Sequence, residues 1–188
     1  VSGNALGIPK IEISIPDYYT FPLLDGLISI KGNFAHGWLG KTQILDSIKG
    51  PNGSAIFIPS NNTPKTYFHQ KSFYTKIGRN NWRLKLYGGF NHQVYWGNEK
   101  AAYGSNFNLT SLETFFYVAT GKTYGENSIP ASKIGNQLGS IDFGVEYDLE
   151  NIRLMVYRQN FYDVGALAKL ANINDGLNGL SLENKNFN

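Results

Sequence analysis

Few residues of this chain have a type and spacing suited to acid–base or metal chemistry. His36, His69 and His92 are the only histidines, and no two of them have the His-Glu-x-x-His spacing of a helical zinc motif. Asp142 and Glu146 are four residues apart, which in a strand separates them by about 13 Å, whereas a carboxylate pair that hydrolyses glycosides needs roughly 5 to 9.5 Å. We therefore assign no catalytic residue, no metal and no cofactor.

The composition narrows the class of protein further. The 188 residues include 21 Gly, 12 Tyr, 12 Phe and no Cys, and only 16% are charged, against about 25% in ordinary globular proteins. The absence of Cys excludes disulfides and thiol catalysis. The 17 basic and 14 acidic residues are scattered, so the chain has no basic cluster for nucleic acid. Many aromatic residues and glycines together with few charged residues are typical of a β-rich membrane or sugar-binding protein.

Residues 82–96 alternate apolar and polar side chains most regularly. One phase carries Trp82, Leu84, Leu86, Gly88, Phe90, His92, Val94 and Trp96, and the other carries Arg83, Lys85, Tyr87, Gly89, Asn91, Gln93 and Tyr95. Because successive side chains of a strand point to opposite faces, one face is apolar and the other polar. A strand of this length spans about 50 Å, and Trp at both ends is typical of the aromatic girdles of membrane barrels.

Six further segments show the same alternation. They are residues 27–38, 141–147 and 152–159, with weaker patterns at 8–15, 67–77 and 177–182. The sequence therefore predicts about seven strands.

The connections between these strands differ in length in a regular way. Residues 78–81 and 148–151 form short connections, whereas 40–65, 97–137 and 163–176 are long, and 16–26 is intermediate. Because neighbouring strands are antiparallel, successive connections lie at alternate ends of the sheet, and this order places the short connections at one end and the long ones at the other. Outer-membrane barrels have the same arrangement, with short periplasmic turns and long external loops. Within the loop at 97–137, a short helix is expected at residues 109–119, capped by Thr110 or Ser111 with Glu113 in its first turn.

We predict an all-β fold, an antiparallel transmembrane β-barrel of the outer membrane, as one domain over residues 1–188. Bacterial barrels have even strand numbers starting at eight, so about seven strands indicate part of a larger barrel. The alternative is a soluble antiparallel sandwich, which also alternates its side chains and has loops at both ends.

Six blocks of residues, in order along the chain, resemble the capsule assembly Wzi family. They are Phe34-Ala35-His36-Gly37, His69-Gln70-Lys71-Ser72, residues 93–97, Leu138-Gly139-Ser140, Tyr157-Arg158-Gln159 followed by Asp163, and Asp175-Gly176-Leu177-Asn178-Gly179-Leu180. The resemblance implies a lectin-like outer-membrane barrel of about eighteen strands that helps to hold capsular polysaccharide at the cell surface. The chain departs from the family in having room for about seven strands and no helical bundle.

The polar phases carry Lys, Arg, Asn, Gln, Tyr, Asp and Glu, a lining suited to water, to contact with a plug or to sugar. The loop at 97–137 adds aromatic side chains, which either bind sugar rings or pack on one another. For polysaccharide binding near the external end we select His69, Lys71, Asn91, Gln93, Tyr95, Arg158, Gln159 and Asp163.

The leading hypothesis is a non-enzymatic outer-membrane protein of a Gram-negative bacterium. Its expected partners are capsular or extracellular polysaccharide, outer-membrane lipid and other envelope proteins, but no nucleic acid. Two alternatives remain: a porin-like channel for sugars or other solutes, and a structural subunit of a cell-envelope complex.

Overall fold

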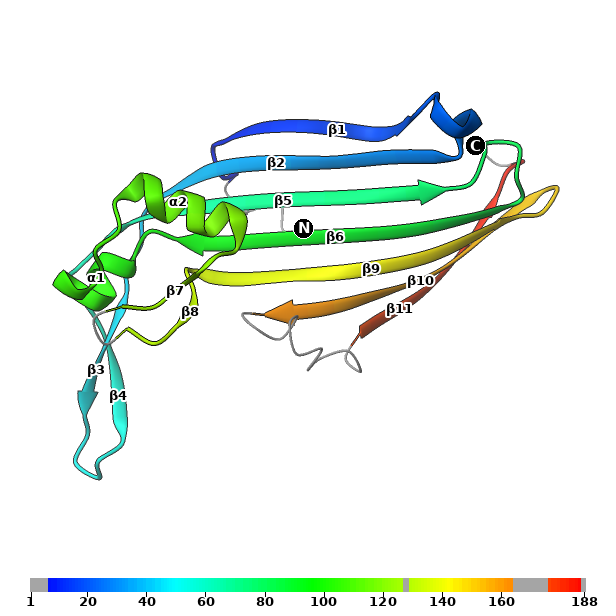
Figure 1. Cartoon of the computed structure of the whole chain (residues 1–188). Helices are drawn as coiled ribbons and strands as arrows, with labels where there is room; N and C mark the ends of the chain where they lie inside the picture. The colour runs from blue at the N-terminus through cyan, green and yellow to red at the C-terminus, as the bar shows by residue number, and fades with distance from the viewer. Residues whose placement is uncertain (1–6, 127–128, 164–175, 187–188) are drawn as a thin grey trace. The chain divides into compact units, whose positions relative to one another are not determined.

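Seven long strands dominate the computed structural model, which describes residues 7–126, 129–163 and 176–186. They are β1 (Lys10–Thr20), β2 (Ile28–Lys41), β5 (Lys65–Ile77), β6 (Leu84–Trp96), β9 (Asn136–Asp148), β10 (Ile152–Asp163) and β11 (Gly176–Asn184). They form one antiparallel sheet in the order β1-β2-β5-β6-β9-β10-β11 (Figure 1). The seven predicted strands are confirmed, while the sheet is not closed into a barrel.

The chain divides into two compact units. Unit 1 comprises residues 1–11, 36–69 and 94–136, and unit 2 comprises residues 12–35, 70–93 and 137–188. Strands β1, β2, β5, β6 and β9 contribute residues to both units. Each unit has its own packing and is described by itself.

Strand β1 is longer than the alternation predicted, because it continues through Pro16 to Thr20. Proline has no backbone N–H for the ladder and is therefore confined mainly to edge strands. Since β1 is an edge of the sheet, Pro16 does not end it. The connection that follows is a short 3-10 helix, η1 (Leu23–Gly26), so the predicted turn at 16–26 begins too early.

The long connection from β6 to β9 carries the helices of unit 1. They are α1 (Glu99–Tyr103), η2 (Gly104–Asn106) and α2 (Ser111–Thr120), followed by the short strands β7 (Thr123–Tyr124) and β8 (Ser132–Lys133). The predicted helix is confirmed as α2. Its N-cap is Thr110, whose hydroxyl accepts the Glu113 N–H at 3.3 Å while a Glu113 carboxylate oxygen accepts the Thr110 N–H at 2.8 Å. This reciprocal capping satisfies two amides that the helix itself leaves unpaired.

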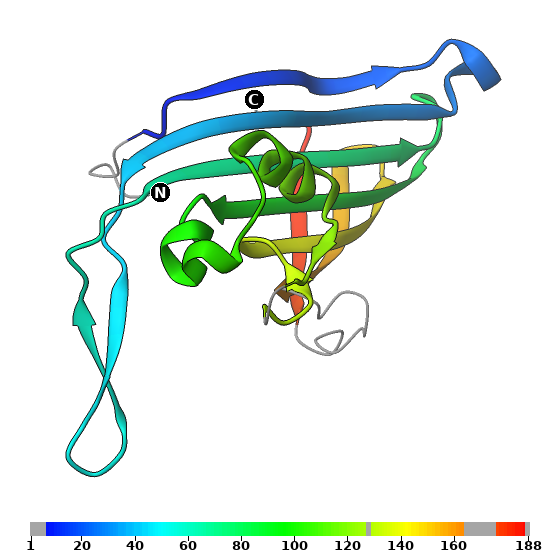
Figure 2. The same ribbon diagram turned by 60° about the vertical axis from the view of Figure 1, so that its left-hand side comes forward.

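The core of unit 1 joins this connection to the ends of β5 and β6. Helix α2 lies over these strand ends in both views (Figures 1 and 2). The buried members are Val94, Trp96, Phe107, Val118, Tyr124 and Ile134. The loop that was expected to hold aromatic side chains therefore buries several of them against its own strands.

A separate hairpin fills the long connection between β2 and β5. It consists of β3 (Leu45–Lys49) and β4 (Ala55–Pro59), which pair antiparallel (Figure 2). From the sequence, this segment was expected to be only a long connection. The connections at residues 78–83 and 149–151 are short, as predicted, and the predicted long connection at 163–176 lies almost wholly outside the described residues. No helix in the described part of the chain is long and apolar enough to cross a membrane.

Candidate functional site

One face of unit 2 exposes large apolar side chains. The pairing of β9, β10 and β11 places Val145 opposite Val156, and Val156 opposite Leu180. Val156 is 51% exposed and Leu180 is 66% exposed. The same phase of these strands exposes Phe143, Tyr147 and Leu182. The apolar phase predicted from the sequence is therefore an open surface here, which we call the apolar face.

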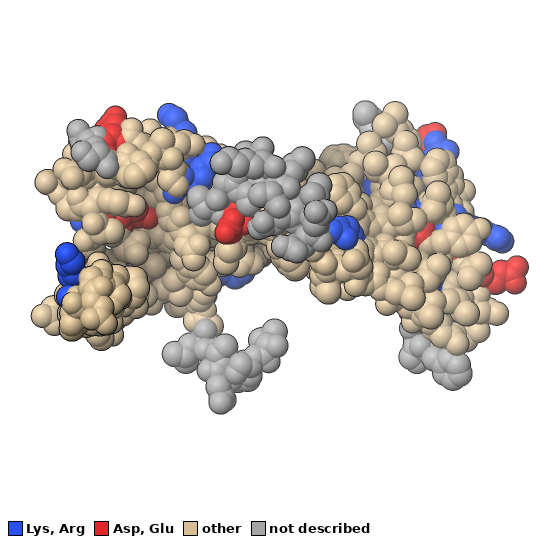
Figure 3. Space-filling model, turned by 90° about the horizontal axis from the view of Figure 1, so that it is seen from below, with Lys and Arg blue, Asp and Glu red and all other residues tan. Residues whose placement is uncertain are grey.

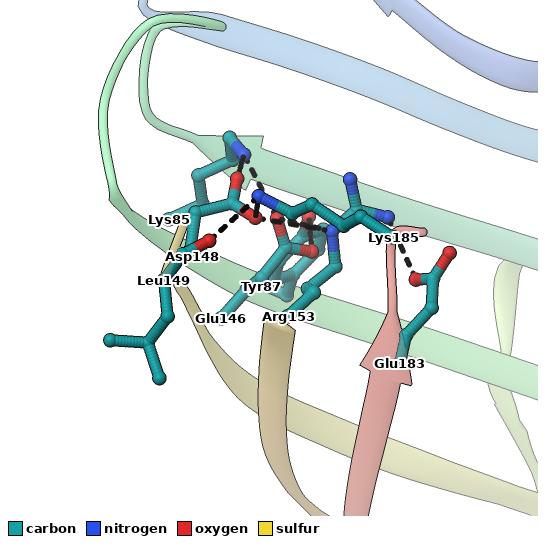
Figure 4. Close-up of polar contacts among 8 residues, drawn as sticks. All are labelled: Lys85, Tyr87, Glu146, Asp148, Leu149, Arg153, Glu183 and Lys185. Atoms are coloured by element: carbon teal, nitrogen blue, oxygen red, sulfur yellow. Dashed lines mark hydrogen bonds and ion pairs between the residues drawn. The ribbon is translucent and has the colours of Figure 1, made fainter. Parts of the chain in front are cut away.

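The opposite face of the same strands, which we call the polar face, carries a network of ion pairs (Figure 4). The Lys85 ammonium donates to Glu146 and to Asp148, each at 2.9 Å. The Tyr87 hydroxyl donates to the second Glu146 oxygen at 2.8 Å. Side chains of Lys85 and Glu146 are about nine-tenths buried, so Lys85 neutralises carboxylates that are costly to leave unpaired.

The strand register explains why these charges meet. Arg153 pairs with Asp148 across β9 and with Glu183 across β11. Its guanidinium donates to Glu183 at 2.9 Å, while the Lys185 ammonium lies 2.7 Å from Asp148. The network is thus located beside the short connection at residues 149–151, and it links β6, β9, β10 and the end of β11.

A hollow lined by tyrosines lies farther along the polar face. Its volume is about 410 Å³, and its lining includes Tyr18, Tyr74, Tyr87 and Tyr157 together with Lys31, Asp142 and Gln159. The Tyr74 hydroxyl donates to Asp142 Oδ2 at 2.9 Å. The Lys31 ammonium lies 4.8 Å from the Tyr18 ring centroid and 5.6 Å from that of Tyr74. Aromatic faces, an ammonium and a carboxylate are therefore gathered in one concave surface.

Glycines on neighbouring strands hold the tyrosine rings in place. A Cβ atom at Gly89 would overlap the Tyr74 ring, and one at Gly179 would overlap the Tyr157 ring. Each ring thus lies flat over the backbone of an adjacent strand because no side chain occupies that position. Aromatic side chains that cover glycine in this way also fix strand register.

A second ring cluster lies on the apolar-phase side of unit 2, around His92. Its ring is buried and hydrogen-bonds Gln137 at 3.1 Å. The rings of Phe90, His92 and Tyr162 are nearly parallel and lie 6.0 to 6.3 Å from one another. The Tyr162 hydroxyl donates to the Asn91 carbonyl at 3.1 Å. Packing and hydrogen bonding thus account for His92.

Unit 1 holds the other two histidines among aromatic rings. The His36 ring lies 5.7 Å from Trp96 and 5.2 Å from Phe115 of α2, and the His69 ring lies 5.8 Å from Phe115. The His36 ring also lies 5.2 Å from the Trp38 ring. No group of three or more His, Cys, Asp or Glu side chains that could hold a metal occurs in the described ranges.

The residues predicted for polysaccharide binding do not form one cluster. His69 and Tyr95 belong to unit 1, while Lys71, Asn91, Gln93, Arg158, Gln159 and Asp163 belong to unit 2. Gln159 lines the tyrosine hollow. Arg158 pairs with Phe143 and donates to Asn178 at 3.1 Å, which places it on the apolar-phase side. Lys71 shares the phase of the exposed Phe73, and by alternation it also lies away from the hollow.

Most residues of the hollow were not predicted from the sequence. Tyr18 lay in a segment predicted to be a connection, and Gln159 was the one residue of the hollow selected for binding. The available signal was the recurrence of Tyr on the polar phase, at Tyr87 and Tyr157. That signal alone does not show which strands become neighbours.

Figure 3 shows one face of the molecule, on which basic and acidic side chains are few and separated by uncharged residues. That face therefore has no extended patch of one sign.

Comparisons with family models, curated proteins and solved structures found no match to this chain.

Proposed function

We propose that the chain forms part of the wall of an outer-membrane β-barrel in a Gram-negative bacterium, and that this wall binds capsular or extracellular polysaccharide without altering it chemically. The observation that carries the proposal is the contrast between the two faces of β9, β10 and β11. Val145, Val156 and Leu180 are exposed on one face, whereas Asp142, Tyr157 and Gln159 line a hollow on the other.

The apolar face supports the membrane part of the proposal. A soluble antiparallel sheet buries its apolar face and exposes its polar one. In unit 2 the arrangement is reversed, because Lys85 and Glu146 are buried while Val156 and Leu182 are exposed. Lipid hydrocarbon is the solvent in which such a face is stable.

The polar face supports the saccharide part of the proposal. Tyrosine rings provide flat surfaces for the apolar faces of sugars, and amide and charged groups provide hydrogen bonds for hydroxyls. The hollow combines both kinds of group. The resemblance to the capsule assembly Wzi family, carried by the six sequence blocks, favours the same function and suggests that the remainder of the barrel is supplied by further strands.

The connections suggest an orientation for this wall. Short turns are periplasmic in outer-membrane barrels, and long loops are external. The ion-pair network beside residues 149–151 would then lie toward the periplasm.

A retention assay tests the function. The full chain, refolded into lipid vesicles, should retain purified capsular polysaccharide in a pull-down. The combined variant Tyr157→Ala with Gln159→Ala should lose most of the retained polysaccharide, whereas the matched control Val156→Ala, on the apolar face of the same strand, should not. Lack of retention by the unaltered protein would contradict the proposal.

Two further measurements separate the alternatives. A steady ion current in planar bilayers without polysaccharide retention would favour a solute channel. Copurification of protein partners in fixed ratio, without glycan, would favour a structural subunit of an envelope complex.

A further inference from the structure

We propose that the tyrosine hollow binds an acidic sugar residue, with the Lys31 ammonium holding the sugar carboxylate and the tyrosine rings packing against the sugar ring. This inference rests on the proposed saccharide binding and narrows it to a chemical class and a place. It assigns a role to residues of the hollow that were not among those predicted for binding, apart from Gln159.

Lys31 supplies the positive charge. Its ammonium lies against the Tyr18 and Tyr74 rings, and no carboxylate of the described residues forms an ion pair with it. The Lys76 ammonium provides a second positive charge near the same ring, 5.6 Å from the Tyr18 ring centroid. A lysine ammonium has three donors and no acceptor, so a carboxylate is the natural partner for Lys31.

Two acidic side chains of this part of the polar face, Glu146 and Asp142, are held by other groups. Glu146 is paired with Lys85 at 2.9 Å and has Arg153 at 3.7 Å. Asp142 accepts the Tyr74 hydroxyl through Oδ2. Each of these carboxylates is thus held by partners other than Lys31.

Asp142 points to a ligand that also carries hydroxyl groups. Its second oxygen, Oδ1, is buried and has no hydrogen-bond partner among the described residues. A buried acceptor without a partner is costly, and a ligand hydroxyl that reaches it removes that cost. A simple carboxylate would pair with Lys31 but has no hydroxyl to donate to Asp142 Oδ1. A uronic acid has both the carboxylate and the hydroxyls.

The size and floor of the hollow fit one sugar unit of a longer chain. The volume of about 410 Å³ lies within the range of about 300 to 1,000 Å³ that small-molecule sites occupy. Gly144 contributes to the lining and carries no side chain, which leaves room above the sheet. A Cβ at Gly144 would already lie 3.2 Å from Met155 Cε, so Gly144→Val should narrow the hollow.

The test compares an acidic oligosaccharide with its neutral counterpart. Binding of alginate oligosaccharides to the refolded full chain is measured by calorimetry, alongside the same oligosaccharides with carboxyl groups reduced to alcohols. The acidic form should bind about tenfold more tightly, because a hydrogen bond to a charged group contributes about that factor to the affinity. Lys31→Gln should abolish that preference, Lys31→Arg should preserve it, and the exposed hairpin control Lys49→Gln should leave it unchanged.

The outcomes distinguish this inference from the proposed function. Equal affinity for acidic and reduced oligosaccharides, or a preference that survives in Lys31→Gln, overturns the assignment to an acidic sugar while saccharide binding stands. Loss of all binding in Gly144→Val, with an unchanged unfolding curve, supports the hollow as the site. Failure of the unaltered protein to bind either oligosaccharide overturns the inference, and retention of capsular polysaccharide in the pull-down then decides the proposed function separately.

Discussion

The ring of Tyr74 on β5 lies over Gly89 on β6, in space that any side chain at position 89 would fill. From there its hydroxyl reaches Asp142 on β9 at 2.9 Å. Since β6 lies between β5 and β9 in the sheet, one tyrosine bridges three neighbouring strands. A missing side chain on the middle strand makes this bridge possible, and the bridge forms one wall of the tyrosine hollow.

Gly89→Ala should therefore displace Tyr74 and break its hydrogen bond to Asp142. Overpacking of this kind costs about 1 to 3 kcal/mol, and urea unfolding of the refolded protein measures it. The matched control is Gly88→Ala on the same strand, where a Cβ would meet nothing within 4 Å. Equal stability of the two variants would contradict this account of the tyrosine position.

Lys85→Gln should destabilise the protein by about 2 to 4 kcal/mol, because it leaves two largely buried carboxylates without their shared ammonium. Arg79→Gln is the control, since the Arg79–Asp25 pair has side chains 39% and 89% exposed and exposed pairs contribute about 1 kcal/mol or less. Adding Glu146→Gln to Lys85→Gln should recover part of the loss, because coupled residues are not additive. A double variant as unstable as the sum of the single variants would show that the two residues act independently.

Val156→Arg tests whether the apolar face meets lipid. In lipid vesicles an arginine near the middle of the membrane costs about 2 to 4 kcal/mol, whereas at an exposed site of a soluble protein the change lies within about 0.5 kcal/mol. Leu112→Arg is the control, because Leu112 is 65% exposed on α2, outside the strands proposed to span the membrane. Equal unfolding free energies for the two variants would count against lipid contact at Val156.

The capping box of α2 predicts a pH dependence. Hydrogen bonds from the backbone and hydroxyl of Thr110 hold the pKa of Glu113 below its ordinary value of 4.5. A carboxylate with a lowered folded-state pKa stabilises the fold above the unfolded-state value, and this contribution is lost as the pH falls through the folded-state pKa. Amide hydrogen exchange in α2, corrected for intrinsic rates, should therefore accelerate relative to the rest of unit 1 as the pH falls below about 4.5.

In Glu113→Gln this additional acceleration should be absent, while Glu126→Gln, in the same connection but outside α2, should retain it. If Glu113→Gln and the unaltered protein had the same pH profile, Glu113 would not be the source of the faster exchange in α2 at low pH.

The sequence by itself determined the seven strands, their apolar and polar phases and the helix α2. These features are local: alternation along residues 84–96 and the Thr110 and Glu113 pair each need only a few neighbouring residues. The end of β1 was misjudged because the effect of Pro16 depends on its being in an edge strand, which is a property of the sheet.

Only the tertiary structure decided which polar residues meet. Lys85 and Glu146 are 61 residues apart in the chain, and the Tyr74–Asp142 contact spans 68 residues. Alternation assigns each residue to a face but does not give the register between strands, and a shift of register would place different side chains opposite one another. The hollow and the ion-pair network depend on that register, whereas the division into an apolar and a polar face was already present in the sequence.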